Sequence, residues 1–186
     1  MIINLMDKVY EMKQVFKVID ELEDRRIMPY ISRDSIEFIS MICRIARPEN
    51  VLEIGTMHGY SSLWLSLYAK EVTALEINAE SAAIARENFK KADCNNVNII
   101  LGDAIEILKK LDNKFDIILI DAMKSQYKQY LELSLKLLNK NGLIFADNTI
   151  SHKEDLKELF DFLERSSLYY KELNLGRGLM VISNLH

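Results

Sequence analysis

The sequence predicts an α/β fold in which helices cover both faces of a mostly parallel sheet. Short apolar runs alternate with helical stretches five times, the chain contains only six glycines, and the alternation ends in two strands joined by a short turn. Repeated strand-then-helix units are typical of a parallel sheet, because each helix returns the chain to the same edge. The low glycine count disfavours an all-β fold built from many tight turns.

The composition is that of a soluble globular protein, with 49% hydrophobic and 28% charged residues. A chain of 186 residues suits one domain, here a helical extension over 1–47 followed by an α/β core over 48–186. The net charge of −4 provides no overall attraction to nucleic acid or to an anionic membrane. Two distant cysteines match no metal spacing, and the sequence contains neither a signal-peptide profile nor a membrane-spanning run. We therefore expect a cytoplasmic protein with no membrane association.

Two amphipathic helices are expected before the alternation begins. Apolar residues recur near a 3.6-residue period within Ile2–Glu23 and again within Arg33–Arg47. Pro29 separates the two helices and Pro48 ends the second, because proline removes a backbone donor and disfavours a helical residue before it.

Five short aliphatic runs follow, each with the length of a buried strand. The expected strands are Val51–Ile54, Val72–Leu75, Val97–Leu101, Phe115–Ile120 and Leu143–Ala146. The expected helices behind them are Ser61–Lys70, Ala79–Ala92, Ala104–Leu111, Gln126–Leu138 and Lys153–Arg165. The last two strands, Leu168–Leu175 and Leu179–Asn184, are separated only by Gly176-Arg177-Gly178 and predict an antiparallel hairpin at the sheet edge.

Acidic residues gather at the carboxyl ends of the five expected parallel strands. In an open α/β sheet, ligands bind outside these ends, near the point where the strand order reverses. The acidic residues at the five ends are Glu53, Glu76, Asp103, Asp121 and Asp147. Chance would not concentrate carboxylates so strongly at one edge, and we therefore expect the functional site there.

The first strand leads into the turn Glu53-Ile-Gly55-Thr-Met-His-Gly59-Tyr-Ser61. Gly55 lets the chain leave the strand sharply, Gly59 lets the backbone approach a ligand, and Ser61 lies where helix N–H groups point at an anion. The Gly-x-Gly-x-x-Gly dinucleotide motif is absent. Glu76 ends the second strand about 20 residues after Gly55, where an acidic side chain accepts hydrogen bonds from ribose hydroxyls. The pair predicts a ribose-bearing ligand without pyrophosphate, while plain turn glycines and a helix-capping Glu76 remain the alternative.

A second constellation combines Asp121-Ala-Met-Lys124 with Asp147-Asn148. Two carboxylates and an amide at neighbouring strand ends suit a hard octahedral cation. A positive charge beside Lys124 would favour its neutral amine, which is a usable base. In the alternative interpretation, which spacing alone favours, Asp121 and Asp147 cap helices and Lys124 is a solvated surface lysine.

Three segments carry a resemblance to a known family: Val51-Leu-Glu-Ile-Gly55-Thr-Met-His-Gly59-Tyr-Ser-Ser62, Phe115-Asp-Ile-Ile-Leu-Ile-Asp121-Ala-Met-Lys124 and Gly142-Leu-Ile-Phe-Ala-Asp147-Asn148. In this order and spacing the chain resembles the cation-dependent class I O-methyltransferases, which include catechol and caffeoyl-CoA O-methyltransferases. The resemblance covers about residue 28 to the C-terminus. It implies a Rossmann-like methyltransferase fold with seven strands, S-adenosylmethionine as donor and a divalent cation, usually Mg²⁺.

The resemblance also implies a role for individual residues. Asp121, Asp147 and Asn148 would hold the metal, and Lys124, beside Asp121, would be the general base. The residues implied to bind the cofactor are Ile31, Glu53, Gly55, Met57, Gly59, Ser61, Glu76, Gly102, Asp103, Ala104 and Asp121.

The acceptor implied by the resemblance is a small catechol-like molecule whose hydroxyl is chelated by the metal. The short N-terminal extension and the short stretch after Asn148 suggest an open acceptor pocket, and Arg177 replaces a residue that is often acidic in relatives, which favours an anionic acceptor. Two alternatives stay open: O-methylation of a hydroxyuridine in tRNA, and non-catalytic binding of an adenosyl ligand. Relatives are often homodimers, and the apolar N-terminal helix could supply such an interface.

Overall fold

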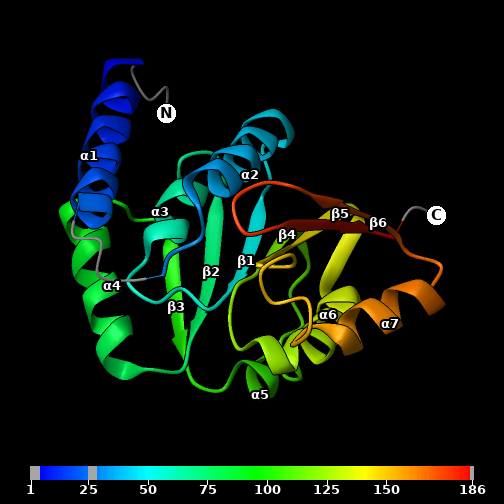
Figure 1. Cartoon of the computed structure of the whole chain (residues 1–186). Coiled ribbons are helices and arrows are strands. Elements are labelled where there is room, and N and C mark those ends of the chain that lie inside the picture. Colours follow the sequence, from blue (N-terminus) through cyan, green and yellow to red (C-terminus); the bar gives the residue numbers. More distant parts are fainter. Residues whose placement is uncertain (1–4, 25–28, 185–186) are drawn as a thin grey trace.

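The computed structural model describes residues 5–24 and 29–184, and a seven-stranded sheet forms its centre (Figure 1). The strand order is β3-β2-β1-β4-β5-β7-β6. β1 to β5 are parallel, whereas β7 and β6 add an antiparallel hairpin at one edge, so the predicted fold class is confirmed. The strands are β1 Asn50–Ile54, β2 Glu71–Glu76, β3 Val97–Leu101, β4 Phe115–Ile120, β5 Leu138–Asp147, β6 Tyr169–Leu173 and β7 Leu179–Ser183.

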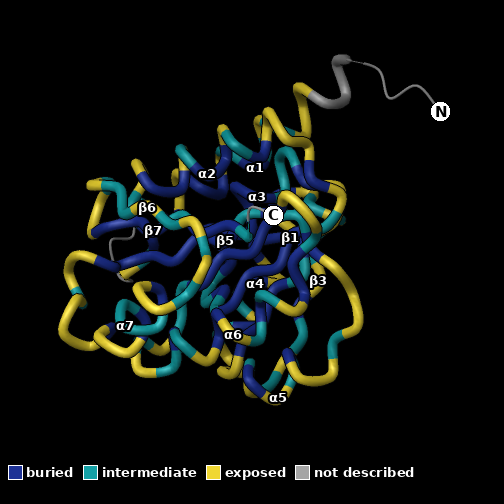
Figure 2. Tube along the Cα trace, turned by 90° about the vertical axis from the view of Figure 1, so that its right-hand side faces the viewer, coloured by how far each residue is buried: buried dark blue, intermediate teal, exposed yellow. Residues whose placement is uncertain are grey.

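Helices cover both faces of the sheet (Figure 2). Side chains alternate across a strand, so that Val51 packs with α1 to α4 while Leu52 and Ile54 pack with α5 to α7. The sheet therefore separates two hydrophobic cores. The helices are α1 Leu5–Asp24, α2 Arg33–Ala46, α3 Tyr60–Ser66, α4 Ala79–Lys91, α5 Ala104–Leu108, the 3₁₀ turn η1 Lys124–Gln126, α6 Tyr127–Leu137 and α7 Lys157–Arg165.

The helix predicted from Lys153 begins four residues later, at Lys157. After β5 the backbone is instead hydrogen-bonded to the turn between β6 and β7. Thr149 N–H donates to the Gly178 carbonyl at 3.1 Å, and Ile150 N–H donates to the Arg177 carbonyl at 3.0 Å. This long-range pairing could not be read from local periodicity. The first residues of the predicted N-terminal helix, Ile2–Asn4, lie outside the described residues.

The strand order reverses between β1 and β4, and the two strands are in direct contact there. Gly55 has a φ of +93°, and a Cβ at this position would collide with the carbonyl oxygen of Asp121. A glycine is required because the turn after β1 crosses so close to the end of β4. Within residues 5–24 and 29–184, no helix is both long and apolar enough to cross a membrane.

Candidate active site

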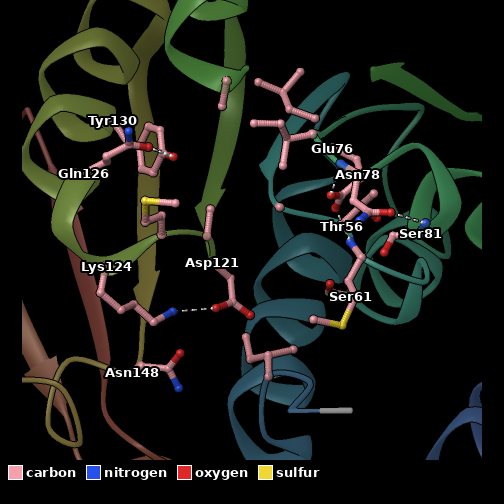
Figure 3. A pocket seen from close by; sticks show the side chains of 18 of the residues that line it. Thr56, Ser61, Glu76, Asn78, Ser81, Asp121, Lys124, Gln126, Tyr130 and Asn148 are labelled. Carbon is pink, nitrogen blue, oxygen red and sulfur yellow. Dashed lines mark hydrogen bonds and ion pairs between the residues drawn. The ribbon is translucent and has the colours of Figure 1, made fainter. Parts of the chain in front are cut away.

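A cavity of about 590 Å³ opens at the carboxyl edge of the sheet, where the strand order reverses. Figure 3 shows polar side chains facing one another across it: Glu76, Asn78 and Ser81 on one side, Asp121 and Lys124 on the other. The predicted site residues that form its wall are Ile31, Gly55, Met57, Ser61, Glu76, Gly102, Asp103, Ala104, Asp121, Lys124 and Asn148. Most of the predicted site residues, which are spread along the chain from Ile31 to Asn148, thus meet in one cavity.

Glu76, at the end of β2, holds the turn that follows β1. Its Oε2 accepts the backbone N–H of Met57 at 2.8 Å, and its Oε1 accepts that of Asn78 at 2.8 Å. Asn78, rather than Glu76, caps α4 by accepting the N–H of Ser81. The helix-capping alternative for Glu76 is therefore wrong, and the free lone pairs of its carboxylate can accept hydrogen bonds from a ligand in the cavity.

Gly59 contributes to helix packing, and the cavity wall does not include it. It precedes α3 with a φ of +86°, and a Cβ there would collide with the Phe89 ring on α4. The sequence predicts that Gly59 lets a ligand approach the backbone closely. In the structure the close approach is made by a neighbouring helix.

Glu53 lies beneath the cavity, with no exposed surface, and is not part of its wall. Its Oε2 accepts a hydrogen bond from the Ser62 hydroxyl, which also contacts the Thr56 hydroxyl at 2.6 Å. Burial raises the pKa of Glu53 to about 7, against the opposing hydrogen bonds of Ser61, Ser62 and Thr56. The predicted direct contact of Glu53 with a cofactor is therefore corrected, because this carboxyl supports the β1–α3 turn from below.

Lys124 is held by two partners inside the cavity. Its Nζ donates to Asp121 Oδ1 at 3.0 Å and to the Tyr127 hydroxyl at 2.6 Å, and its side chain is only 18% exposed. Burial, followed by the charges of Asp121 and Asp147, raises the pKa of Tyr127 well above its ordinary value. Tyr127 therefore stays protonated and accepts the hydrogen bond from Lys124. The alternative of a solvated surface lysine is wrong.

Tyr127 is a site residue that the sequence reasoning missed. It follows Lys124 by three residues, and across the η1–α6 junction this spacing brings both side chains to one face. That spacing was the available signal. A tyrosine at the start of a helix is nevertheless more readily interpreted as core, and this one is indeed fully buried.

Asp147 ends β5 in a buried position, 1% exposed. Neither of its carboxylate oxygens has a hydrogen-bond partner within the described part of the chain. Burial and then the nearby charge of Asp121 raise the pKa of Asp147 to about 7. Among the described helices, Asp121 and Asp147 cap none, because Met123, Gln126 and Leu156 precede η1, α6 and α7.

These oxygens suit a hard cation. The carboxylates of Asp121 and Asp147 lie near each other, and the oxygens of Asp147 receive no hydrogen bond from the described residues. Asn148 adds an amide at the cavity wall. Carboxylate and amide oxygens are the ligands of Mg²⁺ and Ca²⁺. Within the described residues, no three His, Cys, Asp or Glu side chains gather as a metal site, so Asn148 would have to serve as the third protein ligand.

The segment before α2 covers another part of the cavity. Pro29, Tyr30 and Ile31 line it, and Tyr30 hydrogen-bonds His58 Nδ1 at 3.0 Å while its ring stacks on that of Tyr60 at 5.0 Å. The lining residues that were not predicted include Thr56, Gln126, Tyr130 and His152. Arg177 was singled out by its turn position and does line the cavity.

Comparison with known proteins identifies the relatives of this chain. A family model described as O-methyltransferase matches residues 6–174. Catechol O-methyltransferase of Niastella koreensis is 33% identical over 136 residues, which cover 69% of this chain and 62% of that protein. Caffeoyl-CoA O-methyltransferase of Populus kitakamiensis is 33% identical over 137 residues, covering 69% and 58%. The matched region thus spans about six tenths of the length of these curated relatives.

The fold has close counterparts among solved structures. The SAH-bound methyltransferase of Podospora anserina superposes with a TM-score of 0.81 at 25% sequence identity, covering 91% of this chain and 86% of that one.

Proposed function

The chain belongs to the O-methyltransferase family, and from that premise we propose that it transfers a methyl group from S-adenosylmethionine to a hydroxyl of a small catechol-like acceptor. The observation that carries the proposal is that one cavity holds both the Glu76 carboxylate, which keeps lone pairs for a ligand, and the half-buried Lys124–Asp121 pair. Fold alone would not support an activity, because one fold hosts many functions. The proposed activity therefore depends on these side chains.

The donor is assigned to the half of the cavity bordered by β1, β2 and β3. Glu76 would accept hydrogen bonds from the ribose hydroxyls, while Gly102, Asp103 and Ala104 would border the adenine. The methionine part would lie along the turn at Gly55, which lines the cavity. SAH in the Podospora anserina relative supports this class of ligand.

The acceptor is assigned to the half bordered by β4 and β5. A divalent cation, which we propose to be Mg²⁺, would be held by Asp121, Asp147 and Asn148, and when bound it lowers the pKa of a hydroxyl that it contacts. The unpartnered oxygens of Asp147 support this assignment, since buried carboxylates otherwise need protein donors.

Lys124 is the residue that we assign as general base. As the acceptor oxygen forms its bond to the methyl carbon, the sulfur keeps the electron pair of the broken S–C bond and the hydroxyl proton moves to the lone pair of Nζ. This step requires the neutral amine of Lys124, the form that a cation bound beside it would favour. Asp121 and Tyr127 orient Nζ for this transfer. The remaining contribution is orientation of oxygen, methyl and sulfur in line, because the activated methyl comes with the cofactor.

The test measures donor binding and methyl transfer separately. Calorimetric titration should detect S-adenosylmethionine binding to the folded protein, and labelled methyl should reach members of a catechol panel in the presence of Mg²⁺ but not EDTA. Absence of donor binding would refute the proposal. Transfer that is indifferent to EDTA would remove the metal and return Asp147 and Asn148 to a structural role.

O-methylation of a hydroxyuridine in tRNA is a second candidate. One observation favours it: Arg177 is exposed at the cavity wall, where it could meet a phosphate. Undermodified tRNA offered beside the catechol panel separates the two acceptors. A non-catalytic role is opposed by the ordered base at Lys124, for which a binding protein has no use.

A further inference from the structure

We propose that Arg177 forms an anion-binding subsite at the acceptor end of the cavity, so that the preferred acceptors carry a carboxylate or phosphate group near the hydroxyl that is methylated. This inference rests on the proposed function, because that function defines which end of the cavity receives the acceptor. It goes further by naming the chemical class of the acceptor and the residue that selects it.

The sheet topology brings Arg177 to this end. β7 pairs antiparallel with β5, and Leu179 is the partner of Asp147 in the register. Arg177 lies just before β7, so its backbone is beside the strand end that carries Asp147 and Asn148. Glu76, on β2, is separated from that end by β1 and β4. The guanidinium therefore belongs to the acceptor half of the cavity.

The turn that carries Arg177 is fixed on both sides. Its carbonyl accepts the N–H groups of Ile150 and Ser151, each at 3.0 Å. A Cβ at Gly176 would collide with Ser32 on the α2 side, and one at Gly178 would collide with Ile150. The backbone of Arg177 is therefore held in place, and a pre-ordered backbone reduces the entropy that binding an anion would cost.

Arg177 forms no ion pair with any residue of 5–24 or 29–184. Over the described residues, no carboxylate lies within 4 Å of its guanidinium, whereas Lys124 is paired with Asp121 at 3.0 Å. Arg177 precedes β7, whose Leu179 is the register partner of Asp147, and Asp121 lines the same cavity as Arg177. If a divalent cation is bound, the two carboxylates are neutralised and Arg177 leaves a net positive charge that an anionic acceptor would balance.

The shape of a guanidinium also suits the binding of a carboxylate or phosphate. Its planar fork donates two parallel N–H bonds to a carboxylate or phosphate, and such charge-assisted pairs are stronger than neutral hydrogen bonds. Loss of the fork at a partly exposed site should cost about tenfold in the preference for an anionic acceptor.

The experiment compares matched anionic and neutral acceptors. The first pair is 3,4-dihydroxybenzoate and 3,4-dihydroxybenzamide; the second is 5-hydroxyuridine 5′-monophosphate and 5-hydroxyuridine. For each pair the anionic-to-neutral ratio of kcat/KM is measured in the wild type, Arg177→Gln, Arg177→Lys and Lys171→Gln. Lys171 is exposed on β6 and outside the cavity wall, so its substitution controls for the loss of one positive charge.

We expect the wild type to favour the anionic member of one pair. Arg177→Gln should lower the anionic-to-neutral ratio of kcat/KM about tenfold, and Arg177→Lys should give a ratio between those of the wild type and Arg177→Gln. Lys171→Gln should give the same ratio as the wild type. The pair that responds distinguishes a carboxylate acceptor from a phosphate-bearing one. An unchanged ratio in Arg177→Gln, or an equal fall in Lys171→Gln, would overturn the subsite.

Binding measurements separate this inference from the proposed function. The four acceptors are titrated calorimetrically into protein saturated with S-adenosylhomocysteine and Mg²⁺. If no acceptor is methylated but an anionic one binds about tenfold more weakly to Arg177→Gln, the subsite stands and the catalytic proposal fails. If binding of both anionic acceptors is the same in the two proteins, the subsite is refuted whether or not methyl transfer occurs.

Discussion

Replacing Glu53 with Gln removes a buried ionisable group from beneath the β1–α3 turn while keeping its shape and the acceptor for Ser62. In the wild type the carboxyl is fully buried, its Oε1 has no hydrogen-bond partner in the described residues, and its pKa is raised to about 7. The neutral amide imitates the protonated acid. Glu53→Gln should therefore make the stability of the protein less dependent on pH.

The direction and size of the pH effect on unfolding free energy follow from the difference in the pKa of Glu53 between the folded and unfolded states. Below the ordinary pKa of 4.5 the group is protonated in both states; as the pH rises toward 7 the unfolded chain ionises first, and stability is lost. Above pH 7 both states are ionised and the loss is constant. Between pH 5.5 and pH 8 Glu53 should cost the wild type about 2 kcal/mol, at 1.36 kcal/mol for each unit of difference in pKa.

The assay is urea denaturation followed by fluorescence of Trp64, the single tryptophan and a buried one. The change in unfolding free energy between pH 5.5 and 8 is compared in the wild type, Glu53→Gln and Glu87→Gln, the last removing an exposed carboxylate on α4. We expect a smaller loss in Glu53→Gln alone, with affinity for S-adenosylmethionine kept within about threefold, which corresponds to less than 1 kcal/mol. Equal losses in all three proteins would refute a neutral, buried Glu53.

Three further predictions concern the cavity. Lys124→Met should lower turnover at least ~100-fold with little change in calorimetric donor affinity, and unchanged turnover would remove it as the base. Tyr127→Phe keeps the packed ring but removes the hydroxyl that accepts from Lys124, so kcat should fall about tenfold at constant donor affinity; a change in KM alone would contradict an orienting role. Gly55→Ala should destabilise the protein by about 2–4 kcal/mol in urea denaturation, because its φ of +93° and the Asp121 carbonyl leave no room for a Cβ, and wild-type stability would contradict that crossing.

The edge of the sheet that bears the site could be predicted because strand periodicity and strand-end carboxylates are local signals. Glu76, Asp121 and Asn148 reach one cavity because parallel strands end at the same edge. What sequence reasoning could not supply depends on long-range packing. Gly59 faces a ring 30 residues away on α4, and Tyr30 reaches His58 from the segment before α2.

Glu53 is another residue whose role depends on how the chain packs. It belongs to the strand that begins the cofactor motif, and its position in sequence does not distinguish a side chain that faces the cavity from one that faces α3. Because side chains alternate between the two faces of the sheet along β1, Glu53 lies on the same face as Val51, and Leu52 and Ile54 lie on the opposite face. The carboxylates at the strand ends are therefore not equivalent: Glu53 supports the turn, Glu76 holds it and keeps lone pairs for a ligand, and Asp103 caps α5 beside the cavity.

The order of charges along the sheet edge explains why donor and acceptor would occupy fixed ends of one cavity. From β2 to β5 the edge carries Glu76, then the crossing of Gly55 with Asp121, and then Asp147, after which the hairpin adds Arg177. A sulfonium donor is cationic and would be favoured beside Glu76, whereas an anionic acceptor would be attracted by Arg177 once a bound cation balances the charges of Asp121 and Asp147. The same arrangement of charges would exclude an anionic acceptor from the donor half and hold its hydroxyl near Lys124, so that selectivity and alignment would share one electrostatic cause.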